Sequence, residues 1–182
     1  VMDSFVRLAK TGAVEFVAET YYHSLAALYD KEEYKAQIDL ELELLKKEFG
    51  QTPRVFRNTE LIYNDEIGQF IADLGFDAML CEGADDILDW RSPNFVYRVA
   101  GRDMKLLAKN YKLSDDIAFR FSNRAWAEYP LTADKFARWV HGHSGAGDVI
   151  NLFMDYETFG EHQWKETGIF EFLEHFPDLL FT

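Results

Sequence analysis

The chain has 182 residues, of which 48% are hydrophobic and 28% are charged, a composition that favours a packed core and excludes disorder. Its 32 acidic residues outnumber its 19 basic residues and give a net charge of −13. Because this charge repels phosphate backbones and anionic lipids, we expect no nucleic acid or membrane partner. A neutral ligand meets no such penalty.

The cysteine and histidine pattern gives no sign of a disulfide framework or a metal centre. Cys81 is the single cysteine, so no internal disulfide can form, and the histidines lack zinc-binding spacing. We therefore expect no cofactor, and a cytoplasmic location fits this cysteine usage. No apolar run approaches the ~18 residues of a membrane span, and no signal-peptide pattern opens the chain.

The first half of the chain alternates apolar runs of strand length with segments of helical periodicity. Helix signals are clear: Asp30 can cap one helix that Gly50 ends, and Asn64 can cap another that Gly75 ends. Between and before these helices, strands are predicted over residues 13–18, 55–58 and 78–81.

The pattern changes in the second half. Two short apolar runs flank Gly101 and predict an antiparallel hairpin of residues 95–99 and 105–108. Residues 149–154 are apolar on both faces, as expected of a covered strand. Helices are predicted near residues 115–121, 132–141 and 169–176.

Alternation of strands and helices with short connections predicts a parallel α/β sheet or barrel, in which ligands bind beyond the carboxyl ends of the strands. Carboxylates follow several predicted strands, among them Glu60, Asp155 and Glu157. Cleavage of a glycosidic bond requires one carboxylate that attacks and one carboxyl group that protonates the leaving oxygen. The same acids could instead cap the helices that follow.

Three segments of the chain resemble successive signature regions of glycoside hydrolase family 57. They are residues 11–24 (TGAVEFVAETYYHS), 56–65 (FRNTELIYND) and 153–162 (FMDYETFGEH). Residues 90–94 (WRSPN) and 113–122 (LSDDIAFRFS) place the resemblance in the α-amylase-like branch. It implies a retaining enzyme for α-glucans or maltooligosaccharides, of α-amylase or 4-α-glucanotransferase type.

The resemblance also implies roles for individual residues. Glu60 matches the family's nucleophile, and Asp155, which begins a D-x-E-x-F-G pattern, matches the general acid/base. Glu15 and His23 match a substrate-binding region.

The implied fold is an incomplete (β/α)7 barrel of parallel strands, here with an inserted β-hairpin. The family's opening His-Gln-Pro strand and its last signature region have no match in the sequence. We therefore expect residues 1–182 to be part of a single catalytic barrel, with its N- and C-terminal portions in a longer parent chain.

The surroundings of the two catalytic candidates suggest how each is tuned. Glu60 has Thr59 and Tyr63 as possible hydrogen-bond partners that would keep it ionised. Asp155 follows a strongly apolar run, so partial burial could raise its pKa as an acid catalyst requires. Glu157 could be the proton donor instead, and chemistry alone does not separate the two.

Further substrate-binding candidates come from aromatic and polar positions. Trp90 and Trp126 lie in loop-like segments where a large ring has no obvious core to fill, so each could stack on a sugar. Asp116 and Arg120 could reach the sugar or pair with each other at i, i+4. Glu157 and His162 complete the predicted substrate-binding set.

Two other classes of function remain open at this point. A metal-dependent polysaccharide deacetylase uses a similar barrel, but it needs Asp and His ligands, typically with histidines three or four residues apart on a helix. His141 and His143 are two residues apart in a glycine loop, and His162 has no histidine three or four residues away. A non-catalytic or inactive carbohydrate-binding barrel fragment would keep much of the same sequence. The oligomeric state and the choice between hydrolysis and transglycosylation are not encoded in these patterns.

Overall fold

The computed structural model describes residues 2–181, which form two compact units. The first unit contains the described residues up to Glu82 together with Val96–Leu107. The second contains Gly83–Phe95 and the chain from Ala108 onward. Each unit is described by itself below.

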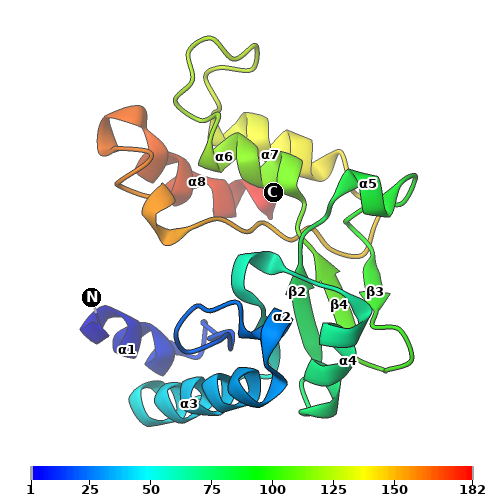
Figure 1. Cartoon of the computed structure of the whole chain (residues 1–182). Helices are drawn as coiled ribbons and strands as arrows, with labels where there is room; N and C mark the ends of the chain where they lie inside the picture. Colours follow the sequence, from blue (N-terminus) through cyan, green and yellow to red (C-terminus); the bar gives the residue numbers. More distant parts are fainter. Residues whose placement is uncertain (1, 182) are drawn as a thin grey trace. The chain divides into compact units, whose positions relative to one another are not determined.

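A mixed four-stranded sheet is the centre of the first unit, and its strands follow the order β1-β2-β4-β3 (Figure 1). Strands β1 and β2 are parallel, with Val55 opposite Ala78, whereas β3 and β4 are antiparallel, with Val96 opposite Leu107. The bounds are β1 Val55–Arg57, β2 Ala78–Cys81, β3 Val96–Arg98 and β4 Lys105–Ala108. These strands and the hairpin are confirmed, and the hairpin extends the main sheet because β4 lies next to β2.

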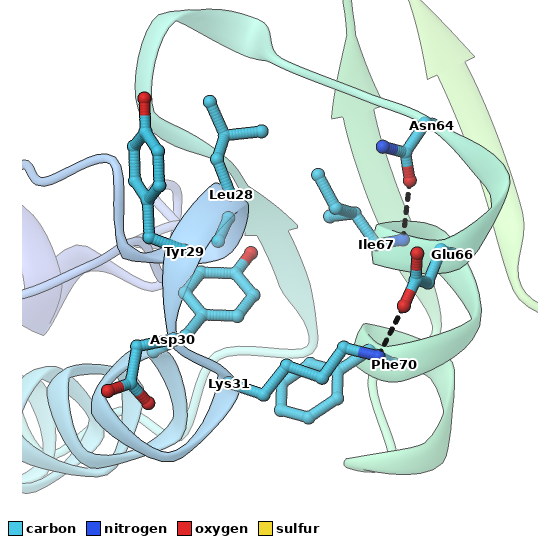
Figure 2. A pocket seen from close by; sticks show the side chains of 10 residues that line it. Leu28, Tyr29, Asp30, Lys31, Asn64, Glu66, Ile67 and Phe70 are labelled. Atoms are coloured by element: carbon cyan, nitrogen blue, oxygen red, sulfur yellow. Dashed lines mark hydrogen bonds and ion pairs between the residues drawn. The ribbon is translucent and has the colours of Figure 1, made fainter.

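Two helices of the first unit, α3 and α4, begin and end where local signals predicted. Asp30 caps α3 by accepting hydrogen bonds from the backbone amides of Glu32 and Glu33, and Gly50 ends it in the left-handed conformation that favours glycine. Asn64 caps α4 through the amide of Ile67 at 2.8 Å (Figure 2). The bounds are α1 Met2–Thr11, α2 Ala26–Tyr29, α3 Lys31–Phe49 and α4 Asp65–Asp73.

The strand predicted over residues 13–18 is wrong as a full strand. Ala18 alone forms a parallel bridge with Phe56 of β1, donating to the carbonyl of Val55 and accepting from the amide of Arg57. Before Ala18, a side chain satisfies the backbone groups in place of a neighbouring strand. The Gln51 side-chain amide accepts a hydrogen bond from Phe16 N and donates one to Val14 O. Segment 13–18 therefore runs extended beside the sheet, with side-chain bonds in place of a regular ladder.

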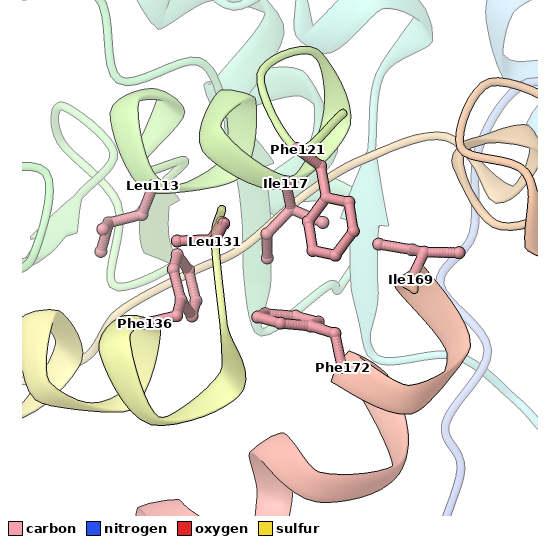
Figure 3. Packing of buried hydrophobic residues seen from close by; sticks show 7 residues of the cluster. All are labelled: Leu113, Ile117, Phe121, Leu131, Phe136, Ile169 and Phe172. Atoms are coloured by element: carbon pink, nitrogen blue, oxygen red, sulfur yellow. The ribbon is translucent and has the colours of Figure 1, made fainter. Parts of the chain in front are cut away.

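The second unit is built around helices that enclose an aromatic core (Figure 3). Phe136 and Phe172 pack with ring centroids 5.6 Å apart, and Phe121 meets Phe172 edge to face at 5.3 Å. The helix bounds are α5 Asp85–Leu88, α6 Tyr111–Ala118, α7 Ala133–His141 and α8 Ile169–Leu180. The core cluster consists of Leu113, Ile117, Phe121, Leu131, Phe136, Ile169 and Phe172.

Two predictions for the second unit need correction. Helix α6 starts four residues before the predicted boundary, because the Asn110 side chain accepts from the amide of Leu113 and so caps the helix there. Residues 149–154 are extended but make only one bridge, between Asn151 and Lys109. Their side chains are half-buried rather than covered on both faces, and Met154 packs against the aromatic core.

Candidate active site

The strongest cluster of functional side chains lies where β1 ends. Glu60 follows this strand in a short 3-10 turn, η1 (Thr59–Leu61), with φ 54° and ψ 23°, and Leu61 also has a positive φ of 56°. His23 has φ 50° in a second turn. The part of the chain that the structure describes has four non-glycine residues with positive φ, and three of them lie in these two turns. Such strained backbone persists where surrounding contacts fix it, and it concentrates at functional sites.

Four ionisable side chains link these two turns. The His23 ring lies between two carboxylates, with Nε2 3.2 Å from Glu60 Oε1 and Nδ1 3.1 Å from Glu19 Oε1. Arg57, at the end of β1, donates from Nη1 to the other Glu19 oxygen at 2.8 Å. The structure thus brings the predicted residues Glu60 and His23 together and adds Glu19 and Arg57, which are not among the predicted site residues. The available signal was the position of Glu19, four residues before His23.

This arrangement shifts the pKa of His23. The hydrogen bond to Glu19 is the main cause that raises the pKa of His23 above its ordinary value, and the Glu60 bond acts in the same direction. Partial burial opposes both effects, but the side chain is 51% exposed and desolvation does not dominate. A protonated ring can donate from both nitrogens at once, one to each carboxylate.

Buried hydroxyl groups fasten the two turns to each other. Thr20 Oγ1 and Thr59 Oγ1 lie 2.9 Å apart, and both residues are fully buried. Thr20 Oγ1 also accepts from the backbone amide of Ser24 at 3.0 Å, which closes the turn that carries His23. Hydrogen bonds shielded from water hold geometry more firmly than exposed ones.

A buried asparagine closes the turn around Glu60. The Asn58 side chain accepts from the Tyr34 hydroxyl at 3.1 Å and donates to the carbonyl of Ile62 at 3.0 Å. Its backbone carbonyl accepts from the amide of Leu61 at 3.0 Å. Asn58 and Ile62 bracket Glu60, so these bonds fix the backbone that aims its carboxylate.

The predicted hydrogen-bond partners of Glu60 are wrong. Thr59 is occupied by Thr20, and the Tyr63 hydroxyl donates to Asp65 at 3.1 Å. Glu60 has a positive φ, and its side chain contacts His23 instead.

Asp155 lies in the second unit, directly before the 3-10 turn η2 (Tyr156–Thr158). The segment is anchored on both sides: Phe153 N donates to Ser114 Oγ at 3.1 Å, and Thr158 accepts from Gln163 N at 2.9 Å. The expected partial burial of Asp155 is wrong, because the chain rises to the surface after Met154 and the Asp155 side chain is exposed.

Glu157 and His162 are joined through the backbone of the same loop. The Glu157 carbonyl accepts from the amides of Glu161 and His162, at 3.2 and 2.9 Å, and the Glu157 and His162 side chains are exposed. In the first unit, Glu15 is exposed on the extended segment beside β1.

The two tryptophan candidates differ in environment. Trp90 follows α5 and is 86% exposed, which agrees with the expectation that its ring fills no core. Trp126 does have such a core, contrary to expectation: it packs against the aromatic cluster and meets Trp139 edge to face at 6.1 Å. The Arg120 guanidinium lies 5.8 Å from the Trp126 ring centroid, within the range of a cation–π contact.

Asp116 and Arg120 adopt the paired alternative. Arg120 Nε lies 2.6 Å from Asp116 Oδ1, and its Nη2 donates to the carbonyl of Lys112 at 2.9 Å. Burial raises the pKa of Asp116, and the Arg120 bond acts against that rise.

Cys81 is buried, and burial raises the pKa of its thiol to about 12. A high thiol pKa opposes nucleophilic chemistry at this sulfur.

Across residues 2–181, the structure brings no three His, Cys, Asp or Glu side chains together in a group that could hold a metal ion. None of the helices in the same described range is long and apolar enough to cross a membrane.

Comparison with known proteins places this geometry in context. The chain is 56% identical over 178 residues to a Methanocaldococcus jannaschii protein named "Putative alpha-amylase", covering 97% of this chain and 38% of that protein. It superposes on a 4-alpha-glucanotransferase from Thermococcus litoralis with TM-score 0.75 and 20% identity, over 96% of this chain and 28% of the other. A branching enzyme from Thermococcus kodakaraensis gives TM-score 0.74 and 14% identity, over 99% of this chain and 46% of the other.

These similarities cover almost the whole chain but less than half of each relative. The structural likenesses, at 20% identity or less, show a shared α/β fold. The family model described as "Glycosyl hydrolase family 57" matches residues 1–181, and the chain therefore belongs to glycosyl hydrolase family 57.

Proposed function

We propose that the protein containing this chain cleaves α-glucans by a retaining mechanism, with Glu60 as nucleophile and Asp155 as general acid/base. The contact between His23 and Glu60 carries the proposal, because it orients one oxygen of an exposed carboxylate at a strand's carboxyl end. The α-glucan class is supported by the family and by relatives named as α-amylase and 4-α-glucanotransferase.

The first chemical step is attack of the Glu60 carboxylate on the anomeric carbon. The bond to the leaving oxygen breaks as a glycosyl–enzyme ester forms, while Asp155 donates its proton to that oxygen. His23 holds one Glu60 oxygen and leaves the other for attack. The Glu19 and Arg57 contacts keep the His23 ring in place, so the nucleophile is pre-positioned before the sugar binds.

In the second step Asp155, now a carboxylate, removes a proton from water or from a sugar hydroxyl. The resulting nucleophile attacks the anomeric carbon and releases Glu60. Water gives hydrolysis, and a sugar hydroxyl gives transfer of the glucan. The exposed position of Asp155 beside η2 is compatible with proton exchange in both steps.

We also propose that the four-stranded sheet is part of the incomplete (β/α)7 barrel that the family resemblance implies. A barrel would bring the carboxyl ends of its strands to one face, where Glu60 and Asp155 must meet if both act on one bond. Retention requires their carboxyl groups to lie roughly 5–5.5 Å apart.

Trapping the covalent intermediate tests the proposal. The full-length protein, given a fluorinated α-glucosyl donor that reacts slowly in the second step, should gain one glycosyl mass on a peptide containing Glu60. Glu60→Gln should abolish this adduct, and Glu43→Gln, a matched change at an exposed acid of α3, should not. Proton NMR should show a first-formed product with retained anomeric configuration. An inverted product, or an adduct that persists in Glu60→Gln, would remove Glu60 from its proposed role.

A further inference from the structure

A pocket of about 360 Å³ lies in the first unit, between the start of α3 and the first turn of α4 (Figure 2). Its volume is within the range of small-molecule sites, ~300–1,000 Å³. The larger apolar side chains of its lining are Leu28, Tyr29, Tyr34, Ile67 and Phe70. None of the catalytic candidates lines it.

The pocket combines a rigid floor with an open aromatic wall. Tyr34 is fully buried and stacks on Phe70, with ring centroids 5.4 Å apart and planes 25° apart. Tyr29 and Leu28, from the short helix α2, are 83% and 46% exposed on the opposite side. An exposed tyrosine ring presents an apolar face and a hydroxyl group together, a combination common at binding surfaces.

Polar groups at the rim select the class of ligand. Lys31 and Glu66 pair at 2.5 Å, so these two charges largely cancel, and Asp30 adds a further carboxylate. This balance, within a strongly acidic chain, disfavours an anion such as phosphate. The Asn64 oxygen is used by the Ile67 amide, whereas its NH₂ group has no hydrogen-bond partner among residues 2–181. A neutral ligand with an apolar face and many hydroxyl groups matches these features.

The floor of the pocket is connected to the catalytic candidate. The Tyr34 hydroxyl donates to Asn58, which closes the turn that carries Glu60, and Asn64 lies four residues after Glu60. A ligand in this pocket therefore lies on the same part of the first unit as the proposed nucleophile.

We infer that this pocket is an accessory subsite that binds a segment of the α-glucan chain away from the cleaved bond, with Tyr29 as its stacking platform. The inference rests on the proposed function and deepens it, since it assigns residues that favour long substrates over short ones. Binding energy from a remote segment of the substrate raises the efficiency of cleavage at the reacting bond.

The test compares substrates of different length in the full-length protein. Tyr29→Ala should raise KM for maltoheptaose roughly tenfold, the effect of losing a fraction of one aromatic side chain's apolar contact, and should change KM for maltotriose far less. Tyr29→Phe keeps the ring and should restore most of the loss. Trp164→Ala, which removes another exposed aromatic ring outside the pocket, serves as the matched control.

Direct binding gives a readout that does not depend on turnover. In a Glu60→Gln background, calorimetric titration with maltoheptaose should show a similar loss of affinity for Tyr29→Ala. Equal KM values for wild type and Tyr29→Ala, or equal losses for both substrate lengths, would overturn the subsite while leaving the proposed function intact. If the wild-type protein neither binds nor cleaves any maltooligosaccharide, the proposed function fails first.

Discussion

His23 Nε2 lies 3.2 Å from Glu60 Oε1, although 37 residues separate the two in sequence and both have left-handed backbone conformations. Neither residue would adopt that conformation readily alone. The buried Thr20–Thr59 and Tyr34–Asn58 bonds hold the two turns in register, so the contact reflects the tertiary structure around it.

The pKa of His23 is the first expected consequence. The pKa should lie above 6.5 in the folded protein. Glu19→Gln should lower this pKa more than Glu60→Gln does, because the hydrogen bond to Glu19 is the main cause of its rise. Since the folded pKa is raised, the stability from this pairing is fully present below pH 6.5 and is lost as the pH rises through the folded value. NMR titration of the His23 ring would measure this, with Glu43→Gln as control. A pKa below 6.5 would contradict it.

Removing the imidazole should slow catalysis more than it weakens the fold. His23→Asn deletes the contact to Glu60, but asparagine tolerates a positive φ, so the change should add little backbone strain. We expect kcat on an α-glucan to fall roughly ten- to a hundredfold with a small change in KM, as for loss of an interaction that positions a nucleophile. His175→Asn, on the exposed side of α8, is the matched control. Full kcat in His23→Asn would mean that Glu60 does not need this partner.

The support under the Glu60 turn should be visible in stability. Tyr34→Phe leaves the buried Asn58 oxygen without its donor, which should cost about 1–3 kcal/mol in the free energy of unfolding, measured in urea. Tyr111→Phe removes a hydroxyl that bonds to exposed Asp85 and should cost much less, since water replaces the lost partner. Equal effects of the two changes would show that the Asn58 bond has no special role.

A close backbone approach makes Gly83 a sensitive position. A Cβ atom there would lie 2.0 Å from the carbonyl oxygen of Lys109, and backbone cannot yield as a flexible side chain does. Gly83→Ala should therefore cost about 3 kcal/mol or more.

Gly142 provides the comparison. It has helical φ and ψ, and the nearest atom to an added Cβ is 3.2 Å away, so Gly142→Ala should stay within about 1 kcal/mol. Thermal unfolding of the two variants would measure the difference. A Gly83→Ala variant as stable as Gly142→Ala would show that the chain relaxes around residue 83.

Local chemistry in the sequence was sufficient for most helices and for the hairpin. Asp30, Gly50 and Asn64 mark helix ends by satisfying backbone groups within four residues, so their effect does not depend on distant parts of the chain. The family resemblance likewise needed only short contiguous segments, and the family match over residues 1–181 confirms it.

Partner choice was decided by the tertiary structure. The apolar runs at residues 13–18 and 149–154 predicted strands, but each run forms a single β-bridge. A regular ladder of backbone hydrogen bonds depends on the neighbouring strand as well as on the apolar residues themselves. In the same way, Thr59 and Tyr63 were plausible partners for Glu60 by proximity in sequence. Their hydroxyls instead bond to Thr20 and Asp65, and Glu60, in a left-handed turn, contacts His23. The Glu60–His23 and Thr59–Thr20 contacts join residues 37 and 39 positions apart in the sequence, beyond the reach of any local pattern.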